Sequence, residues 1–238
     1  MTAFSIVSAL VCSVVVLGTQ IASLPGASSS SGPASAQVAA RVDETDAGSL
    51  GHGYSRRGEH IYFNGVRIDE AGRETLERFQ RTLGRRVTLA HDVDAATFGA
   101  LSEDYSKDKN TVYYKWISPG RFWVVEIPGA DPATFEVMDF NLARDARRVW
   151  RADEVIRGAD AASAQVVHPG WVWRDRRSVY YQSTRIAGAD PVTFRHLNQA
   201  FYADANNVYW SSTRLDGADV RTFRPLGNDA PYAADIRH

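Results

Sequence analysis

The sequence contains a single cysteine, Cys12, and carries almost no net charge. One cysteine excludes disulfide bonds within the chain and zinc sites built from cysteine pairs. The 27 basic and 28 acidic residues give a formal charge of −1 at pH 7, which argues against a nucleic-acid-binding protein and against a polybasic membrane-surface protein. Because 44% of the 238 residues are hydrophobic and 23% are charged, the composition is that of a globular protein.

Motifs of catalysis and of metal binding are missing as well. The six histidines follow no metal-ligand spacing, and no Gly-x-Ser-x-Gly sequence marks a nucleophile. The glycines of segment 51–58 lack the spacing of a phosphate-binding loop, and a recurring Asp-x-Asn lacks the ligand density of a calcium loop. We therefore expect no catalytic residue, no metal and no cofactor, and the chain is predicted not to be an enzyme.

Charged side chains are absent between Met1 and Arg41. Residues 3–24 are apolar or uncharged, and as a helix they would measure about 33 Å, close to the thickness of a hydrocarbon core. The small-residue sequence at 34–36 resembles a signal-peptidase site, but it lies far from the end of the apolar run, and no Lys or Arg precedes that run. A cleaved signal peptide and an uncleaved signal anchor therefore both stay open.

The N-terminal segment sets the predicted domain organisation. We expect residues 1–24 to be a signal peptide or signal anchor, residues 25–50 to be a flexible Ser/Gly/Ala/Pro linker, and residues 51–238 to be the folded domain. The domain is then exported to the periplasm or to the outer face of the cytoplasmic membrane. It contacts the membrane through residues 3–24 if that segment is retained.

Two motifs recur in register along the rest of the chain. The tripeptide Gly-Ala-Asp occurs at 129–131, 158–160, 188–190 and 217–219, in steps of 29, 30 and 29 residues. An Asp followed four residues later by Val and an aromatic residue recurs with it, at Asp108, Asp145, Asp175 and Asp204, and the first step is longer because that unit carries eight extra residues. Six residues after each Gly comes Phe135, Ala164, Phe194 or Phe223. A period that is sustained in this way is typical of a repeat protein.

Each motif has a structural interpretation. The Val-Tyr-Tyr and Val-Tyr-Trp segments are β-branched and aromatic and predict strands, and the Asp before them predicts a tight turn. The Gly of Gly-Ala-Asp supplies a bend, and its Asp is placed to cap a single helical turn, with Pro132 and Pro191 at the first helical position in two copies. Phe135 and Met138, three residues apart, are predicted to lie on one side of that turn.

The predicted fold is mainly β. Tandem units of about 29–30 residues, each a β-hairpin plus a short helical turn, stack into an elongated array because no unit can bury its own apolar face. The units are expected at about 54–104, 105–141, 142–171, 172–200 and 201–231, with a partial unit at 232–238. Near the N-terminal end, Glu70–Leu83 predicts a short amphipathic helix that covers the open end of the array, with Leu76, Phe79 and Leu83 on one side.

One insertion has the composition of a binding surface. Segment 115–123 predicts an aromatic hairpin with two cations and a Pro-Gly turn. Trp and Arg are common anchors of protein interfaces. The candidate partner-binding residues are therefore Lys115, Trp116, Arg121, Phe122 and Trp123. Trp171 and Trp173 lie two apart on one predicted strand face, and core packing is favoured there over stacking on a sugar.

The segment Lys107-Asp108-Lys109-Asn110…Tyr113-Tyr114, together with Gly-Ala-Asp-Pro-x-Thr-Phe, closely resembles the DKNYY repeat family of bacterial proteins. The resemblance runs from about Tyr54 to the C-terminus. It departs from the pattern at insertions 69–91 and 116–123, at Arg57 in place of Asp, and at Ala164 in place of Phe. The resemblance implies an envelope-associated protein and supplies no catalytic residues.

We therefore expect an exported or membrane-tethered protein that acts as a non-catalytic binding module of the cell envelope, with a protein or a glycan as partner. Two alternatives stay open. One is an inhibitor or immunity-type protein against a secreted toxin. The other is a protein that binds or hydrolyses cell-wall glycans.

Overall fold

The computed structural model describes residues 48–198, 200–226 and 232–236. The predicted signal segment and most of the predicted linker lie outside these residues, although residues 48–50 of that linker begin the first strand. No helix in the described residues combines the length and the hydropathy needed to span a membrane.

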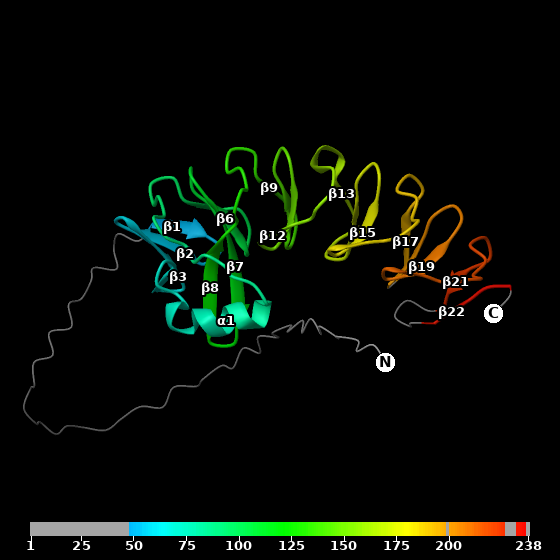
Figure 1. Cartoon of the computed structure of the whole chain (residues 1–238), viewed down its shortest axis with the longest axis horizontal. Coiled ribbons are helices and arrows are strands. Elements are labelled where there is room, and N and C mark those ends of the chain that lie inside the picture. The colour runs from blue at the N-terminus through cyan, green and yellow to red at the C-terminus, as the bar shows by residue number, and fades with distance from the viewer. Residues whose placement is uncertain (1–47, 199, 227–231, 237–238) are drawn as a thin grey trace, which may run out of the picture. The chain divides into compact units, whose positions relative to one another are not determined.

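The chain folds into five four-stranded antiparallel sheets in series, each with its strands in sequence order, followed by a two-stranded sheet (Figure 1). We name them sheets A to F. Sheet A contains β1 (Gly48–Gly51), β2 (Tyr54–Arg57), β3 (His60–Phe63) and β4 (Val66–Arg67). Sheet B contains β5 (Gly99–Ala100), β6 (Tyr105–Lys107), β7 (Val112–Ser118) and β8 (Arg121–Glu126). Sheet C contains β9 (Glu136–Asp139), β10 (Leu142–Arg144), β11 (Val149–Arg151) and β12 (Glu154–Val155).

The remaining sheets repeat this pattern. Sheet D contains β13 (Gln165–His168), β14 (Val172–Arg174), β15 (Val179–Tyr181) and β16 (Thr184–Arg185). Sheet E contains β17 (Arg195–Asn198), β18 (Phe201–Ala203), β19 (Val208–Trp210) and β20 (Thr213–Arg214), and sheet F pairs β21 (Arg224–Pro225) with β22 (Ala233–Ala234). Between sheets A and B, a 3₁₀ turn (Arg73–Thr75) leads into α1 (Leu76–Leu83), so the predicted helix is confirmed with a start three residues later than expected.

The repeating unit has four strands, where the sequence predicted a hairpin and a helical turn. The predicted unit 142–171 begins at β10, but its sheet begins one strand earlier, at β9. The interpretation of Phe135 and Met138 as one helical face was wrong. Phe135 packs between sheets B and C, whereas Met138 lies on β9 and packs between sheets C and D. Residues an odd number apart in an extended chain point to opposite sides.

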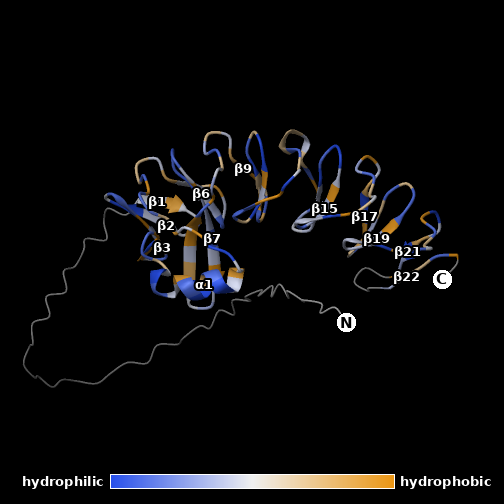
Figure 2. Cartoon of the chain, in the orientation of Figure 1, coloured by the Kyte–Doolittle hydropathy of each residue, from blue (hydrophilic) through white to orange (hydrophobic). Residues whose placement is uncertain are grey.

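Neighbouring sheets share their cores because the strands alternate. In β11, Val149 packs with Ala164 and Trp173 toward sheet D, while Trp150 packs with Phe135 toward sheet B. The third strands of the other sheets follow the same rule. Figure 2 shows the resulting mixture of hydrophobic and hydrophilic residues along the strands of each sheet. Each buried face of a sheet is therefore covered by the sheet before it or after it.

In sheet D, where Ala164 stands in place of the recurring Phe, a different aromatic ring fills the core. Trp173 is buried at 2% exposure and stacks on Tyr180, with centroids 4.0 Å apart and planes 3° apart. In sheet E, which keeps Phe194, Tyr202 occupies the corresponding position. A larger indole on the second strand thus occupies volume that Phe supplies elsewhere, which agrees with the close packing of protein interiors.

The recurring Asp of the Val-Tyr motif forms the predicted turn and also ties two segments together. In sheet E, Asp204 Oδ1 accepts the backbone N–H groups of Asn206 and Asn207 at 2.8 and 2.7 Å. Its Oδ2 accepts the Asp190 N–H at 3.1 Å and the Tyr209 hydroxyl at 2.7 Å. Burial alone would raise the pKa of Asp204, but these hydrogen bonds outweigh it and lower the pKa.

The Asp of Gly-Ala-Asp caps its turn as predicted in three of the four copies, whereas Asp160 makes no side-chain cap hydrogen bond to its 3₁₀ turn. Asp190 accepts the Val192 N–H at 3.0 Å and the Thr193 hydroxyl at 2.7 Å, and Thr193 in turn accepts the Ala205 N–H at 3.0 Å. The preceding Gly188 has φ 74°, in the left-handed region that favours glycine. The turn is a 3₁₀ helix only at Ala161–Ser163 among the described residues.

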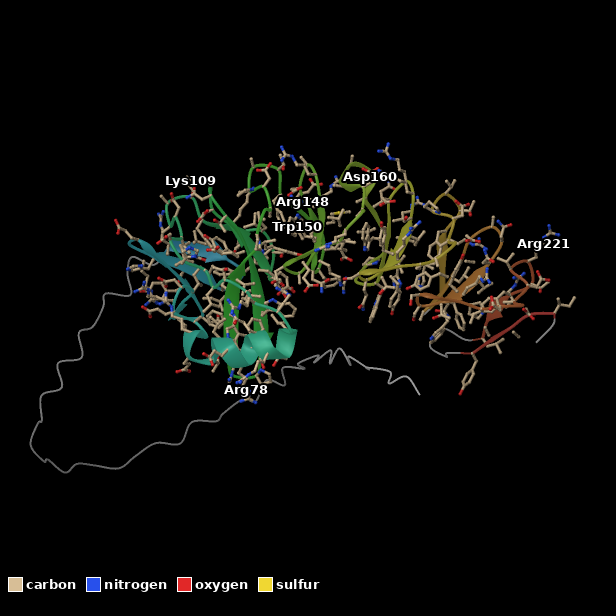
Figure 3. All side chains as sticks on the ribbon, viewed as in Figure 1. Arg78, Lys109, Arg148, Trp150, Asp160 and Arg221 are labelled. Carbon is tan, nitrogen blue, oxygen red and sulfur yellow. The ribbon has the colours of Figure 1, made fainter. Side chains whose placement is uncertain are left out.

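These bonds define two ends of each sheet. The Asp-turn end holds the turn between the second and third strands and the Gly-Ala-Asp loop. Figure 3 shows Lys109, Arg148, Asp160 and Arg221 along this edge. The hairpin end holds the two other turns of each sheet, and in sheet B it carries the extension of β7 and β8.

Candidate functional site: a groove between α1 and the β7–β8 hairpin

The predicted aromatic hairpin is the extension of β7 and β8. The two strands pair from Tyr113↔Glu126 to Ser118↔Arg121, and Pro119 and Gly120 form the two-residue turn. Gly120 has φ 74°, as the second central residue of a Pro-Gly turn requires. This register places Trp116 directly opposite Trp123, so the two indoles share one face of the hairpin.

Helix α1 packs on this face of the hairpin. Phe79 stacks on Trp123 with ring centroids 4.2 Å apart and planes 5° apart, and it meets Trp116 edge-on at 6.1 Å. Leu76 and Leu83 pack against the same cluster, as the predicted apolar face of the helix requires. The helix therefore covers the hairpin of sheet B, where the sequence analysis expected it to cover the open end of the array.

Gly72 permits the close approach of the helix to the hairpin. It has φ 72°, and a Cβ at this position would lie 2.9 Å from the Phe122 carbonyl oxygen and inside the contact distance of the Trp123 indole. Any larger residue would push the start of the helix away from β8. Glycine is thus required here both by backbone conformation and by space.

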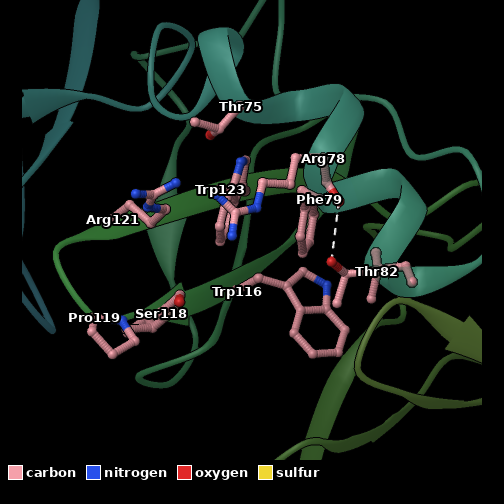
Figure 4. A pocket seen from close by; sticks show the side chains of 11 residues that line it. Thr75, Arg78, Phe79, Thr82, Trp116, Ser118, Pro119, Arg121 and Trp123 are labelled. Atoms are coloured by element: carbon pink, nitrogen blue, oxygen red, sulfur yellow. Dashed lines mark hydrogen bonds between the residues drawn. The ribbon is translucent and has the colours of Figure 1, made fainter.

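A groove of about 480 Å³ runs between the helix and the hairpin tip (Figure 4). Its walls are the apolar surfaces of Phe79, Leu83, Trp116, Ile117 and Trp123. Arg78 from the helix and Arg121 from β8 approach it from two sides, and both are exposed. Leu83 and Trp116 are only partly buried, so the groove presents uncovered apolar surface beside two cations.

Polar contacts hold one wall of the groove to the next sheet. The Trp116 indole Nε1–H donates to Asp153 Oδ1 at 3.1 Å, and Arg85 donates to the same oxygen at 2.7 Å. Arg85 also pairs with Glu154 at 2.5 Å. Burial alone would lower the pKa of Arg85, but these carboxylates outweigh it and raise the pKa. The orientation of Trp116 is thereby fixed.

The five predicted hairpin residues are divided between two faces. Trp116, Trp123 and Arg121 line the groove, although the Trp123 side chain is 6% exposed and lies mainly beneath the helix. Lys115 and Phe122 lie on the face toward sheet A, where the Lys115 Nζ is 3.8 Å from the centroid of the Phe63 ring. Lys115 is 3% exposed, and burial lowers its pKa. These two residues are therefore interior contacts.

Sequence reasoning missed the helix side of the groove. It identified Phe79 and Leu83 as an apolar face but did not bring that face onto the hairpin, and it gave no role to Arg78 or Thr82. A signal was present, because a surplus of large aromatic residues in one insertion and an unpartnered apolar stripe in the other predict mutual burial. No sequence pattern distinguishes Arg78 from the other arginines of the helix.

The prediction that Trp171 and Trp173 both pack in the core was right for Trp173 and wrong for Trp171. Trp173 is in the core, whereas Trp171 precedes β14 and is 41% exposed.

Among the described residues, no group of three or more His, Cys, Asp or Glu is arranged to hold a metal ion.

Comparison with known proteins gives one match. No curated protein and no solved structure is similar enough to the chain to be matched. The DKNYY family matches residues 38–154 and, in a second overlapping match, residues 105–238. Together these two matches span all five four-stranded sheets and both recurring motifs, and the chain therefore belongs to the DKNYY family.

Proposed function

We propose that this chain is an exported or membrane-tethered, non-catalytic binding module of the cell envelope, built as an elongated array of stacked units. The α1–hairpin groove is its binding surface for a partner protein. The apolar segment at residues 3–24 supports the location. The observation that carries the binding role is the groove itself, with its exposed apolar wall and two arginines.

The chemistry of the groove defines the partner. The residues that line it include Arg78 and Arg121 and no acidic residue. Its wall contains Trp116, which is only partly buried and offers flat apolar surface. An extended protein segment that places a large apolar side chain beside an Asp or Glu meets both features, because burial of the apolar group supplies affinity and a guanidinium binds a carboxylate in a fixed geometry.

A secreted toxin that carries such a segment would make the chain an inhibitor, and the same groove serves both versions of the proposal. The versions differ in the partner and not in the surface. Identifying the bound segment therefore decides between them.

A site-specific crosslink tests the proposal. A photoreactive amino acid replaces Ser118, which lines the groove on the same hairpin face as Trp116. A matched variant carries it at Val192, which is 80% exposed in the loop between sheets D and E, away from the groove. We expect a discrete product in the envelope fraction from position 118 and none from position 192. The crosslinked segment is then synthesised as a peptide, and its affinity for the purified chain is measured by fluorescence polarisation.

The charge requirement is tested with the same peptide. Arg78→Glu together with Arg121→Glu should weaken binding about tenfold or more, since each lost ion-paired anchor removes on the order of 1 kcal/mol or more. Arg221→Glu, at the Asp-turn end, is the matched charge control and should leave binding unchanged. Equal crosslinking at positions 118 and 192, or equal peptide affinity in both charge variants, would contradict the proposal.

A further inference from the structure

Two exposed aromatic rings lie on neighbouring turns at the hairpin ends of sheets C and D. Phe140, in the turn between β9 and β10, is 71% exposed, and Trp171, just before β14, is 41% exposed. A Cβ on Gly170 would lie 3.6 Å from Phe140 Cδ2, so the Phe140 ring packs beside the backbone next to Trp171. Trp171 stacks on Tyr181 with centroids 5.9 Å apart. These three rings, on neighbouring turns and strands of two sheets, are called the strip below.

Asp139 holds the two turns together. Its Oδ1 accepts the Phe140 N–H at 3.0 Å, and its Oδ2 accepts the Gly170 N–H of the next sheet. Both carboxylate oxygens are therefore engaged with backbone donors. The position of Phe140 relative to Trp171 is set by these bonds, so the strip exists before any ligand arrives.

Arg151 lies at the same end of sheet C. It is paired with Leu142, which is paired in turn with Asp139. Its guanidinium is half-buried, and within the described residues it makes no hydrogen bond or ion pair. Burial lowers the pKa of Arg151, and the polar groups around it are the Tyr105, Tyr114 and Tyr181 hydroxyls and the Asp139 carboxylate. Five N–H donors in a fixed fork are thus available to an anion.

We propose that this strip, with Phe140, Trp171 and Tyr181 as its rings and Arg151 as its cation, binds a glycan whose sugar residues carry carboxylates. The C–H face of a pyranose ring stacks on exposed aromatic rings, which are otherwise unfavourable on a protein surface. The guanidinium binds the carboxylate through two parallel hydrogen bonds. A phosphate or an acidic peptide uses the cation but gains nothing from the exposed ring surfaces.

This site is separate from the α1–hairpin groove in both residues and chemistry. Failure of one proposal therefore leaves the other intact. The groove variant Arg121→Glu serves as an internal control here, because it should leave sugar binding unchanged.

Titration calorimetry of the full chain with tetragalacturonate tests the site. We expect the acid to bind about tenfold more tightly than its fully methyl-esterified form, because only the acid offers a carboxylate to Arg151. Trp171→Ala and Phe140→Ala should each weaken binding of the acid about tenfold, a loss typical of an anchoring aromatic residue. Val192→Ala, which removes an exposed apolar side chain outside the strip, should have no effect.

Arg151→Gln separates the charge from the rings. The variant should bind the acid and the ester equally, at the affinity with which the wild type binds the ester. Phe140→Ala replaces an exposed side chain and therefore keeps the test valid even if Arg151→Gln fails to fold. No binding of tetragalacturonate by the wild type, equal binding of acid and ester, or equal binding of tetraglutamate would each overturn the proposal.

Discussion

The two ends of the sheets are built on opposite plans. At the Asp-turn end, the same hydrogen bond joins the recurring Asp to the Asp of the preceding Gly-Ala-Asp loop or its equivalent. It occurs as Asp94 to Asp108, Asp131 to Asp145, Asp160 to Asp175, Asp190 to Asp204 and Asp219 to Asp235. At the hairpin end, by contrast, the turns differ from sheet to sheet in length and in exposed side chains.

This contrast shows where the fold can vary without cost. Side-chain oxygens at the Asp-turn end satisfy backbone N–H groups that would otherwise be buried without partners, so a change there leaves several donors unsatisfied. The hairpin turns close on their own strands, and the bond from Gly170 to Asp139 between sheets C and D does not recur as a motif in every sheet. Sheet B therefore carries a long hairpin at that end, and sheets C and D carry exposed rings there. Both proposed binding surfaces lie at the variable end.

The largest effect on stability is expected from a substitution in the hydrophobic core, which is common to both ends of the sheets. Phe194 is 4% exposed and lies 5.7 Å from Tyr202 and 5.4 Å from Tyr209 by ring centroids. Phe194→Ala should lower the free energy of unfolding by about 3–5 kcal/mol, through lost burial and the cavity that remains. Hydrogen exchange should show lost protection in sheets D and E.

Phe223→Ala is the matched variant at the last interface, where Phe223 packs on Phe201 at 5.2 Å. Because each sheet contacts its neighbours, we expect lost protection in sheets E and F only. Equal loss of protection along all sheets in both variants would replace the stacked-unit description with one cooperative core.

A smaller effect on stability is expected from a substitution that changes only the Asp-turn end. Asp204→Ala removes the acceptor for three backbone N–H groups and the Tyr209 hydroxyl. We expect a loss of about 3 kcal/mol in the free energy of unfolding by urea titration, since each buried donor left without a partner costs roughly 1–3 kcal/mol and some will be hydrated. Asp216→Ala removes an exposed carboxylate paired only with the exposed Arg214 and should change stability little. Similar losses in both variants would contradict the role assigned to the Asp-turn end.

The pH dependence of stability should separate the two ends. Hydrogen bonds from Thr134, Ser163 and Thr193 lower the pKa values of the loop residues Asp131, Asp160 and Asp190 below their usual 3.8. A carboxyl whose folded pKa is depressed stabilises the fold above its unfolded pKa, and this contribution is lost as the pH falls through the folded pKa. Stability should therefore decrease below about pH 4.

The hairpin end contributes a separate step at higher pH. Burial and the stacked His196 lower the pKa of His168 in the folded chain below 6.5, its ordinary value in the unfolded chain. At a pH between these two pKa values, the unfolded chain therefore binds more protons than the folded chain. Stability then rises with pH through this window and levels off above about pH 6.5. Urea titrations from pH 3 to pH 8 measure both steps, and His168→Gln should remove only the upper one. An upper step that persists in that variant would assign it to another group.

The smallest expected effect concerns backbone conformation at the hairpin end. Gln182 has φ 55°, a left-handed conformation that costs free energy for a residue with a Cβ. Gln182→Gly should raise the free energy of unfolding by about 0.5 kcal/mol in urea titration. Ser183→Gly, at the next position of the turn, relieves no such strain and should lower stability slightly. Equal changes in the two variants would show that the turn is not strained.

The sequence predicts the separate parts of the candidate site but not the contact between them. The hairpin with its Pro-Gly turn and the helix with Phe79 on its apolar side were both predictable, because turn chemistry and helical periodicity are local. Their contact was not predictable, because 36 residues of chain separate Phe79 from Lys115 and no local rule sets which surface an amphipathic helix covers. Lys115 and Phe122 were misassigned for the same reason: strand alternation places them on the face opposite Trp123, and only the position of sheet A buries that face.

The sequence by itself determined the repeat, the Asp turns, the capping Asp of three of the four Gly-Ala-Asp loops and the strand nature of the Val-Tyr segments. These features rest on short-range hydrogen bonding and on the period of the motifs. Tertiary structure alone decided that each sheet has four strands, that Phe135 and Met138 serve different interfaces, and that Trp173 is buried while Trp171 is exposed. Burial is a property of neighbouring sheets, and two tryptophans two residues apart have different neighbours once the chain has turned.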